Sequence, residues 1–172
     1  MTLAACSSDS DKESDSTPMP SEPTATASTS AADPETTEKT AALAAYKSFW
    51  AEQTKAYAKA SLDGTQLSRY ASGVALADAK ADVASLKEQG VVATGKPKSN
   101  TVVTNIEVNR KVPRATLSDC LDISGWKRVK SDTGKELPIP PERLDRYVTV
   151  VKAEKWGKQW MILDVATQQR SC

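Results

Sequence analysis

The chain has 172 residues, a formal net charge of +1 and no histidine. Without histidine there is no Ser-His-Asp or Cys-His catalytic arrangement and no ordinary zinc site, so we expect no metal and no cofactor. The charge is uneven, with a net −6 over residues 7–40 and a net +7 over residues 41–172. The basic part lacks a nucleic-acid-binding motif and a basic stripe interleaved with aromatics, so nucleic acid is not an expected partner.

The first six residues resemble a targeting signal. Leu3-Ala4-Ala5-Cys6 is similar to a bacterial lipobox, in which small residues precede a cysteine that is lipidated and becomes the new N-terminus. A basic region and an apolar segment of about 7–15 residues precede such a site, and we expect them upstream of Met1. The motif predicts an extracytoplasmic protein held at the cell membrane by a lipid on Cys6. The alternative is an ordinary N-terminus with an isolated cysteine.

Residues 7–39 have the composition of a disordered tether. The stretch 7–40 contains no Val, Leu, Ile, Phe, Tyr or Trp, and 15 of its residues are Ser or Thr. Such a chain cannot bury enough apolar surface to offset the ~1–2 kcal/mol per residue of backbone ordering. We therefore expect a spacer between the anchor and a single domain over residues 40–172. Asp33-Pro34-Glu35 resembles a helix start, so the first helix begins there or nearer Thr40.

Helical periodicity follows as far as Gly90. The first helix is predicted to end before Asp63-Gly64, and its apolar stripe contains Leu43, Tyr46, Trp50 and Tyr57, with Phe49 on the flank. A short second helix is predicted over residues 65–71 and a third over about 74–89, with Gly90 at its C-terminal end. The inward residues of these two helices are expected to be Leu67, Tyr70, Leu76, Ala79, Val83 and Leu86.

Beyond Gly90 the apolar period changes to two, which indicates strands. Strands are predicted over residues 91–96, 102–109, 115–122, 126–130, 144–154 and 159–167. A turn is expected at 97–100 and a proline-rich loop at 131–141. Because the alternate positions are polar, we expect an antiparallel sheet with one face on the helices and one in water. Helices followed by such a sheet give an α+β fold.

The order and size of these elements resemble the cone fold of nuclear transport factor 2 and ketosteroid isomerase. In that cystatin-like cone, a strongly curved antiparallel sheet wraps the N-terminal helices. A closer resemblance, over residues 40–172, is to secreted actinobacterial lipoproteins of this fold. The segments that carry it are Tyr70-Ala71-Ser72-Gly73, Gly95-Lys96-Pro97, Asp119-Cys120-Leu121-Asp122 and the terminal Cys172.

Asp119 is the candidate catalytic residue. Its strand position places it on the same face as Leu117 and Leu121, so it is expected to point inward, and Asp122 toward water. A carboxyl group in an apolar pocket has a raised pKa and can act as an acid or a base. The other candidate pocket residues are Tyr46, Trp50, Tyr57 and Tyr147, of which the tyrosines are its candidate partners. The alternative is a structural Asp119 paired with backbone amides or with Arg114, Arg143 or Arg146.

Lipidation of Cys6 would leave Cys120 and Cys172 in an oxidising compartment, where disulfides persist. In the cone fold the final strand lies in the same sheet as the strand of Asp119. The resemblance therefore implies that a short C-terminal tail reaches Cys120 and that the two cysteines are bonded. Two free thiols and an intermolecular bond are the alternatives.

Three functions compete on this basis. The leading hypothesis is a lipid-anchored binding or accessory protein of the cell envelope, without a catalytic set, whose partner is an envelope protein or a small ligand. The second is a small-molecule isomerase, dehydratase or cyclase of the ketosteroid-isomerase type, using Asp119 with Tyr46 or Tyr57; it rests on fold analogy. The third is an adaptor that docks on a membrane complex through the loop at 131–141.

Overall fold

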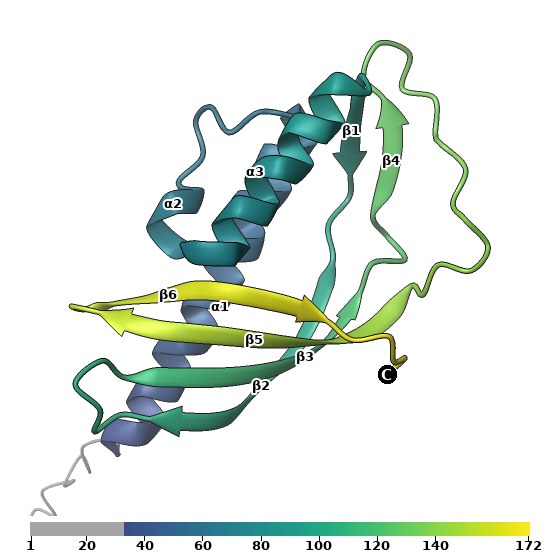
Figure 1. Cartoon of the computed structure of the whole chain (residues 1–172). Coiled ribbons are helices and arrows are strands. Elements are labelled where there is room, and N and C mark those ends of the chain that lie inside the picture. Colours follow the sequence, from purple (N-terminus) through teal and green to yellow (C-terminus); the bar gives the residue numbers. More distant parts are fainter. Residues whose placement is uncertain (1–32) are drawn as a thin grey trace, which may run out of the picture. The chain divides into compact units, whose positions relative to one another are not determined.

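The computed structural model describes residues 33–172, which contain three helices followed by six antiparallel strands (Figure 1). This is the α+β arrangement expected from the periodicity. Cys6 and the predicted tether as far as residue 32 lie outside the described residues.

Helix α1 spans Pro34–Lys59 and begins at the earlier of the two expected positions. The Asp33 side chain caps it by accepting a hydrogen bond from the Thr36 N–H at 3.1 Å, and proline occupies the first helical turn. The residues 34–39 that were assigned to the tether are therefore helical, because the capping signal outweighs the polar composition. The helix ends at Ala60, in the left-handed conformation with φ 45°.

The buried face of α1 combines alanines with aromatic and polar side chains. Its buried members are Ala42, Ala45, Tyr46, Phe49, Glu52, Gln53, Ala56 and Tyr57. Tyr46 and Tyr57 are buried as predicted and Phe49 is only 2% exposed, whereas Leu43 and Trp50 are half-buried. The buried face is therefore turned toward the predicted flank. The prediction weighted the large side chains; the sheet instead packs where alanines allow the backbone of the helix to approach closely.

Two further helices follow. Helix α2 spans Leu67–Tyr70 and α3 spans Gly73–Glu88. Leu67 is buried, and α3 buries Ala79, Val83 and Leu86 as the helical spacing predicts, together with Ala75. Tyr70 and Leu76, which were also expected to point inward, are half-buried. Gly90 has φ 61°, the left-handed conformation expected of a residue that ends a helix.

The strands form two sheets rather than the single sheet that was expected. Strand β1 (Val91–Thr94) pairs with β4 (Lys127–Lys130). The other four have the order β2-β3-β5-β6 and span Lys98–Glu107, Arg114–Asp122, Arg146–Trp156 and Gln159–Thr167.

The two sheets are parts of one bent ribbon. Thr94 lies opposite Lys127 and Lys98 lies opposite Asp122, so three residues on one side of the break face four on the other. At the break Gly95 has φ 77°, and a Cβ there would lie 2.0 Å from the carbonyl oxygen of Gly125. Only glycine fits this contact, and an unequal residue count bends a ribbon, as Figure 1 shows. The expected turn at 97–100 is thus wrong, since β2 already includes residues 98–100.

A second irregularity redirects the outer strand β2. Its register with β3 shifts between Val103 and Asn105, which leaves Thr104 as an extra residue. Val102 is consequently 56% exposed, while Val103 and Ile106 pack on the core. The predicted alternation, which put Val102, Thr104 and Ile106 on one face, is wrong because a bulge moves every later side chain to the other face.

The main core lies between α1 and the four-stranded sheet, with Trp160, Tyr46, Phe49, Leu117 and Ile162 among its fully buried side chains. One polar contact fixes the start of α1 to the last hairpin. The Trp160 indole N–H donates to the Glu38 carboxylate at 2.9 Å, and Lys155 forms an ion pair with the same carboxylate. The Lys155 hydrogen bond lowers the pKa of Glu38 below its usual value.

The disulfide Cys120–Cys172 is formed, with Cα atoms 5.8 Å apart. After β6 the chain stays beside β5, because Gln168 N–H donates to the Val148 carbonyl at 2.8 Å and Val148 N–H donates to the Arg170 carbonyl at 3.0 Å. Val148 is also the register partner of Cys120 on β3. The tail therefore reaches Cys120 across one strand, which confirms the expected pairing.

Reduction of this bond should lower the melting temperature of a Cys6→Ser protein, in which no other thiol remains. The bond joins residues 52 apart, and a closed loop of that size contributes ~4 kcal/mol in the chain-entropy estimate. Calorimetry with and without dithiothreitol measures the shift, and intact mass should rise by two hydrogen atoms on reduction. A Cys6→Ser/Cys120→Ser/Cys172→Ser variant should melt like the reduced protein. Alkylation of both thiols by iodoacetamide before reduction would contradict the assignment.

Candidate functional site

Asp119 lies at the centre of a buried polar cluster under α1. It is 0% exposed, and the groups that donate hydrogen bonds to it come from two other elements. Tyr46 on α1 and Ser99 on β2 each donate a hydroxyl hydrogen bond to Oδ2 at 3.0 Å, and the Asn100 backbone N–H donates to Oδ1 at 2.8 Å. The expectation that Asp119 points inward with Tyr46 as a partner is thus met.

The arginines considered as partners of Asp119 are engaged elsewhere. Arg114 pairs with Glu154, Arg143 donates to the Ile123 carbonyl, and Arg146 contacts the Cys120 sulfur. Within residues 33–172, Asp119 forms no ion pair. The carboxylate is instead stabilised by three hydrogen-bond donors, the arrangement that makes a buried charge tolerable.

Tyr46 donates to Asp119 and cannot easily serve as a base. Burial raises the pKa of its phenol above its usual value, and the negative charge of Asp119 raises it further. Tyr46 therefore stays protonated and keeps its hydroxyl on the carboxylate. Thr149, opposite Asp119 on β5, is 1% exposed and its hydroxyl has no hydrogen-bond partner within residues 33–172.

A groove of about 690 Å³ runs beside this cluster, between α1 and the start of β2. We call it the α1–β2 groove; its lining residues are Leu43, Tyr46, Lys47, Trp50, Ala51, Thr54, Lys96, Pro97, Ser99 and Thr101. Asp119 is not among them, because Tyr46 and Ser99 stand between its carboxylate and the groove. The lining includes two lysines and no acid. The groove can hold an anionic, partly apolar ligand, but it gives that ligand no direct approach to Asp119.

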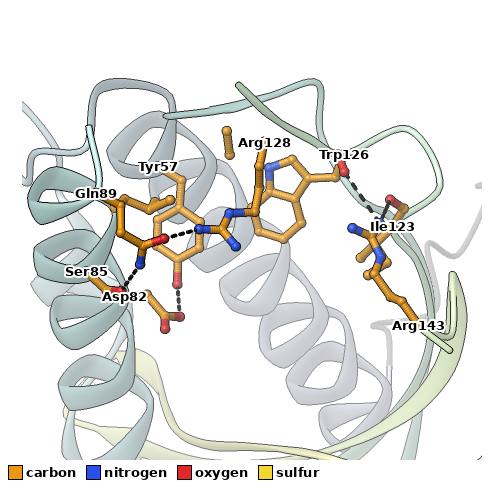
Figure 2. Close-up of a pocket in the computed structure, with 10 residues that line it drawn as sticks. Tyr57, Asp82, Ser85, Gln89, Ile123, Trp126, Arg128 and Arg143 are labelled. Atoms are coloured by element: carbon orange, nitrogen blue, oxygen red, sulfur yellow. Dashed lines mark hydrogen bonds between the residues drawn. The ribbon is translucent and has the colours of Figure 1, made fainter. Parts of the chain in front are cut away.

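A second cavity of about 290 Å³ lies between α3 and the β1–β4 pair (Figure 2). We call it the Arg143 cavity; its lining residues are Tyr57, Asp82, Ser85, Leu86, Gln89, Ala93, Ile123, Trp126, Arg128 and Arg143. Tyr57 stacks on Trp126 with ring centroids 5.5 Å apart and donates its hydroxyl to Asp82. Burial, and then the hydrogen bond to Asp82, raise the pKa of Tyr57.

The structure separates the candidate pocket residues. Tyr46 and Trp50 line the α1–β2 groove, whereas Tyr57 lines the Arg143 cavity. Tyr147 lies opposite Leu121 in register and lines neither, and burial raises its pKa. The expected grouping of Tyr57 with Asp119 is therefore wrong, whereas Tyr147 shares its strand face with Thr149, the register partner of Asp119. The bend in the ribbon places the part of α1 that carries Tyr57 on a different set of strands.

Sequence reasoning missed the Arg143 cavity as a site. Its polar residues Asp82, Arg128 and Arg143 lie on a helix, a strand and a loop, and no short motif links them. The signal available was Trp126, a large aromatic residue at the start of the short strand predicted over residues 126–130.

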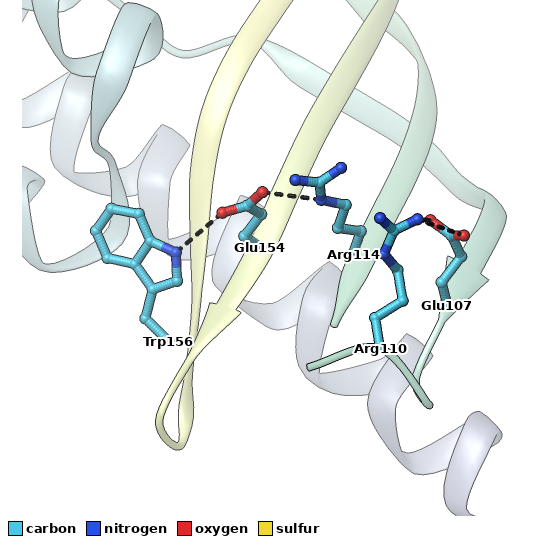
Figure 3. A network of polar contacts seen from close by, with 5 residues as sticks. All are labelled: Glu107, Arg110, Arg114, Glu154 and Trp156. Atoms are coloured by element: carbon cyan, nitrogen blue, oxygen red, sulfur yellow. Dashed lines mark hydrogen bonds and ion pairs between the residues drawn. The ribbon is translucent and has the colours of Figure 1, made fainter. Parts of the chain in front are cut away.

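An exposed polar network joins the far ends of the strands (Figure 3). Glu154 accepts from Arg114 at 2.9 Å and from the Trp156 indole at 3.2 Å, and Arg110 pairs with Glu107 at 3.0 Å. Exposed ion pairs contribute at most about 1 kcal/mol each. We assign this network to the ends of the two hairpins and not to a functional site.

No family model matches the chain, and no curated protein is detectably similar to it. A solved structure, the crystal structure of the intermembrane space region of the chloroplast protein ARC6, shares 14% identity with a TM-score of 0.47. The match covers 81% of this chain and 98% of that one. Similarity at this level carries no functional argument. Within residues 33–172, no helix is long and apolar enough to cross a membrane.

Replacing the buried carboxylate should destabilise the domain. In Asp119→Asn, a side-chain NH₂ replaces an oxygen that now accepts hydrogen bonds, so we expect a loss of about 1–3 kcal/mol in the free energy of unfolding. Asp119→Ala should lose more, because all three donors lose their acceptor. Urea unfolding monitored by tryptophan fluorescence measures both. The matched control is Asp132→Asn, at an exposed position in the loop after β4, and it should leave the midpoint unchanged. An Asp119→Asn protein as stable as the unmodified one would refute the structural role.

Proposed function

We propose that the protein is a lipid-anchored binding or accessory protein of the cell envelope, held on the extracytoplasmic side by Cys6. Its domain is a cone-type α+β fold carried on the tether that ends at Asp33. The Cys120–Cys172 disulfide supports this location, because such bonds persist in oxidising compartments. The bend in the ribbon at Gly95 supports the cone, whose sheet has to curve.

The observation that favours binding over catalysis is the state of Asp119. Three donors occupy its carboxylate, and Tyr46 and Ser99 separate it from the α1–β2 groove. A general base has to reach the proton that it removes. Asp119 reaches only groups of its own chain, so its role is to position the Tyr46 and Ser99 hydroxyls at the groove wall.

The partner that best fits the groove is an extended acidic segment of another envelope protein. Lys47 and Lys96 are exposed at its walls without an opposing acid in the lining. Strand β2 forms one edge of its sheet, with β3 on its other side. An edge strand beside a basic groove can accept an extended chain through backbone hydrogen bonds while the lysines select for acidic side chains.

The alternative is a ketosteroid-isomerase-type enzyme that uses Asp119 and Tyr46. The hydrogen bond between these two residues is the observation that favours it. It requires Tyr46 to move, so that a substrate in the groove reaches the carboxylate.

The anchor is tested by expressing the full-length gene in its native host. The protein should enter the detergent phase on phase partitioning and carry a diacylglyceryl mass on Cys6. Cys6→Ser should be released or remain unprocessed, while Cys120→Ser, a matched substitution, should stay in the detergent phase. An unmodified Cys6 on protein free of the membrane would eliminate the anchor.

The binding role is tested by complementation of a deletion strain. Lys47→Glu/Lys96→Glu should lose complementation, because it reverses the charge that selects an acidic partner. The control, Lys80→Glu/Lys87→Glu, makes the same change in charge on α3, away from the groove, and should complement. Asp119→Asn should complement in proportion to the amount of folded protein exported. A stable, exported Asp119→Asn protein without activity would instead support the enzyme.

A further inference from the structure

We propose that the Arg143 cavity binds a small organic carboxylate with a compact apolar body. This site is distinct from the α1–β2 groove, shares no lining residue with it, and does not depend on the proposed function.

Two arginines, Arg128 and Arg143, line the cavity. Arg143 is fixed there by the hydrogen bond from its Nη2 to the Ile123 carbonyl at 2.9 Å and by an ion pair with Asp145 at 3.3 Å. Arg128 is held by Gln89, whose side-chain oxygen accepts from its Nη2 at 2.7 Å. Figure 2 shows the Trp126 indole between the two arginines, with the Arg128 guanidinium toward Gln89 and the Arg143 guanidinium toward Ile123. Because their backbone and side-chain partners pre-orient them, little side-chain order has to be created when an anion binds.

Two N–H donors in the lining have no acceptor. The Arg143 Nε and the Trp126 Nε1 are buried and make no hydrogen bond within residues 33–172. Buried donors are almost always satisfied, so each such group calls for an explanation. A carboxylate supplies an acceptor oxygen and carries the charge that matches a guanidinium.

The rest of the cavity selects the body of the ligand. Leu86, Ala93 and Ile123 are apolar, and the stacked Tyr57–Trp126 pair adds an aromatic wall. Asp82, which also lines the cavity, accepts a hydrogen bond from the Tyr57 hydroxyl. A second anionic group on the ligand would meet the Asp82 carboxylate, so the ligand carries its charge at one end only. The volume of about 290 Å³ is at the small end of ligand pockets, which favours a single ring or a short chain.

The experiment uses benzoate as the probe and the indole N–H resonance of Trp126 as the readout. The 172-residue chain is labelled with nitrogen-15 and titrated with benzoate, with benzamide as the uncharged match, and the resonance is assigned with Trp126→Phe. Benzoate should shift this resonance saturably with a dissociation constant on the order of 1 mM or below, and benzamide should not. Lys47→Glu/Lys96→Glu should leave the shift intact, which separates this site from the groove.

Two variants test the arginines. Arg143→Gln should weaken benzoate binding by about tenfold or more, the loss expected for one charge-assisted hydrogen bond. Arg128→Gln should weaken it less, because Arg128 is exposed. Arg110→Gln makes the same charge change at the β2–β3 turn and should bind normally. If Arg143→Gln fails to fold, Arg128→Gln decides, and full affinity in that variant overturns the proposal.

Three other outcomes also overturn it. The first is an unshifted Trp126 resonance in a folded protein at benzoate concentrations of about 10 mM. The second is equal binding of benzamide, which would make the cavity an apolar site without charge selection. The third is equal competition by inorganic phosphate, which would show that the two arginines bind an adventitious ion only.

Discussion

The buried carboxylate of Asp119 is the constraint on which the rest of the domain depends. It lies on β3 and accepts hydrogen bonds from Tyr46 on α1 and from Ser99 and Asn100 on β2. A carboxylate that is 0% exposed is tolerable only while its donors stay in place. The charge therefore fixes how the helix crosses the sheet, and it determines which hydroxyls face the α1–β2 groove.

The break in the ribbon at Gly95 divides the strands of the domain into two regions. On one side, β2 and β3 form the main sheet over α1; on the other, β1 and β4 pack near α3. The contact between Gly95 and Gly125 allows the two backbones to meet where the ribbon bends. Because of this bend, Tyr46 of α1 lines the α1–β2 groove and Tyr57 of the same helix lines the Arg143 cavity.

Aromatic side chains lie between the α1–β2 groove and the Arg143 cavity. Trp50 lines the α1–β2 groove and contacts Trp126, which lines the Arg143 cavity, edge to face with ring centroids 5.9 Å apart. Trp126 in turn stacks on Tyr57. The indole nitrogens of both tryptophans are buried without a hydrogen-bond partner in the part of the chain that the structure describes. Both sites thus combine an apolar wall with positive charge, which comes from lysines in the α1–β2 groove and from arginines in the Arg143 cavity.

The sequence by itself determined the helices, most of the strands and the inward direction of Asp119, because each follows from local period. The pairing of the two cysteines was implied by the resemblance to the cone fold. The lipid anchor on Cys6 and the tether stay predictions. Only the tertiary structure decided which face of α1 is buried and which partners Asp119 has. It also showed that one ribbon makes two sheets and that Arg143 shares a cavity with Asp82. A bulge such as that at Thr104 and a bend such as that at Gly95 change which face of the sheet the later side chains occupy. They leave the alternation of apolar and polar residues in the sequence intact, so that alternation cannot reveal them.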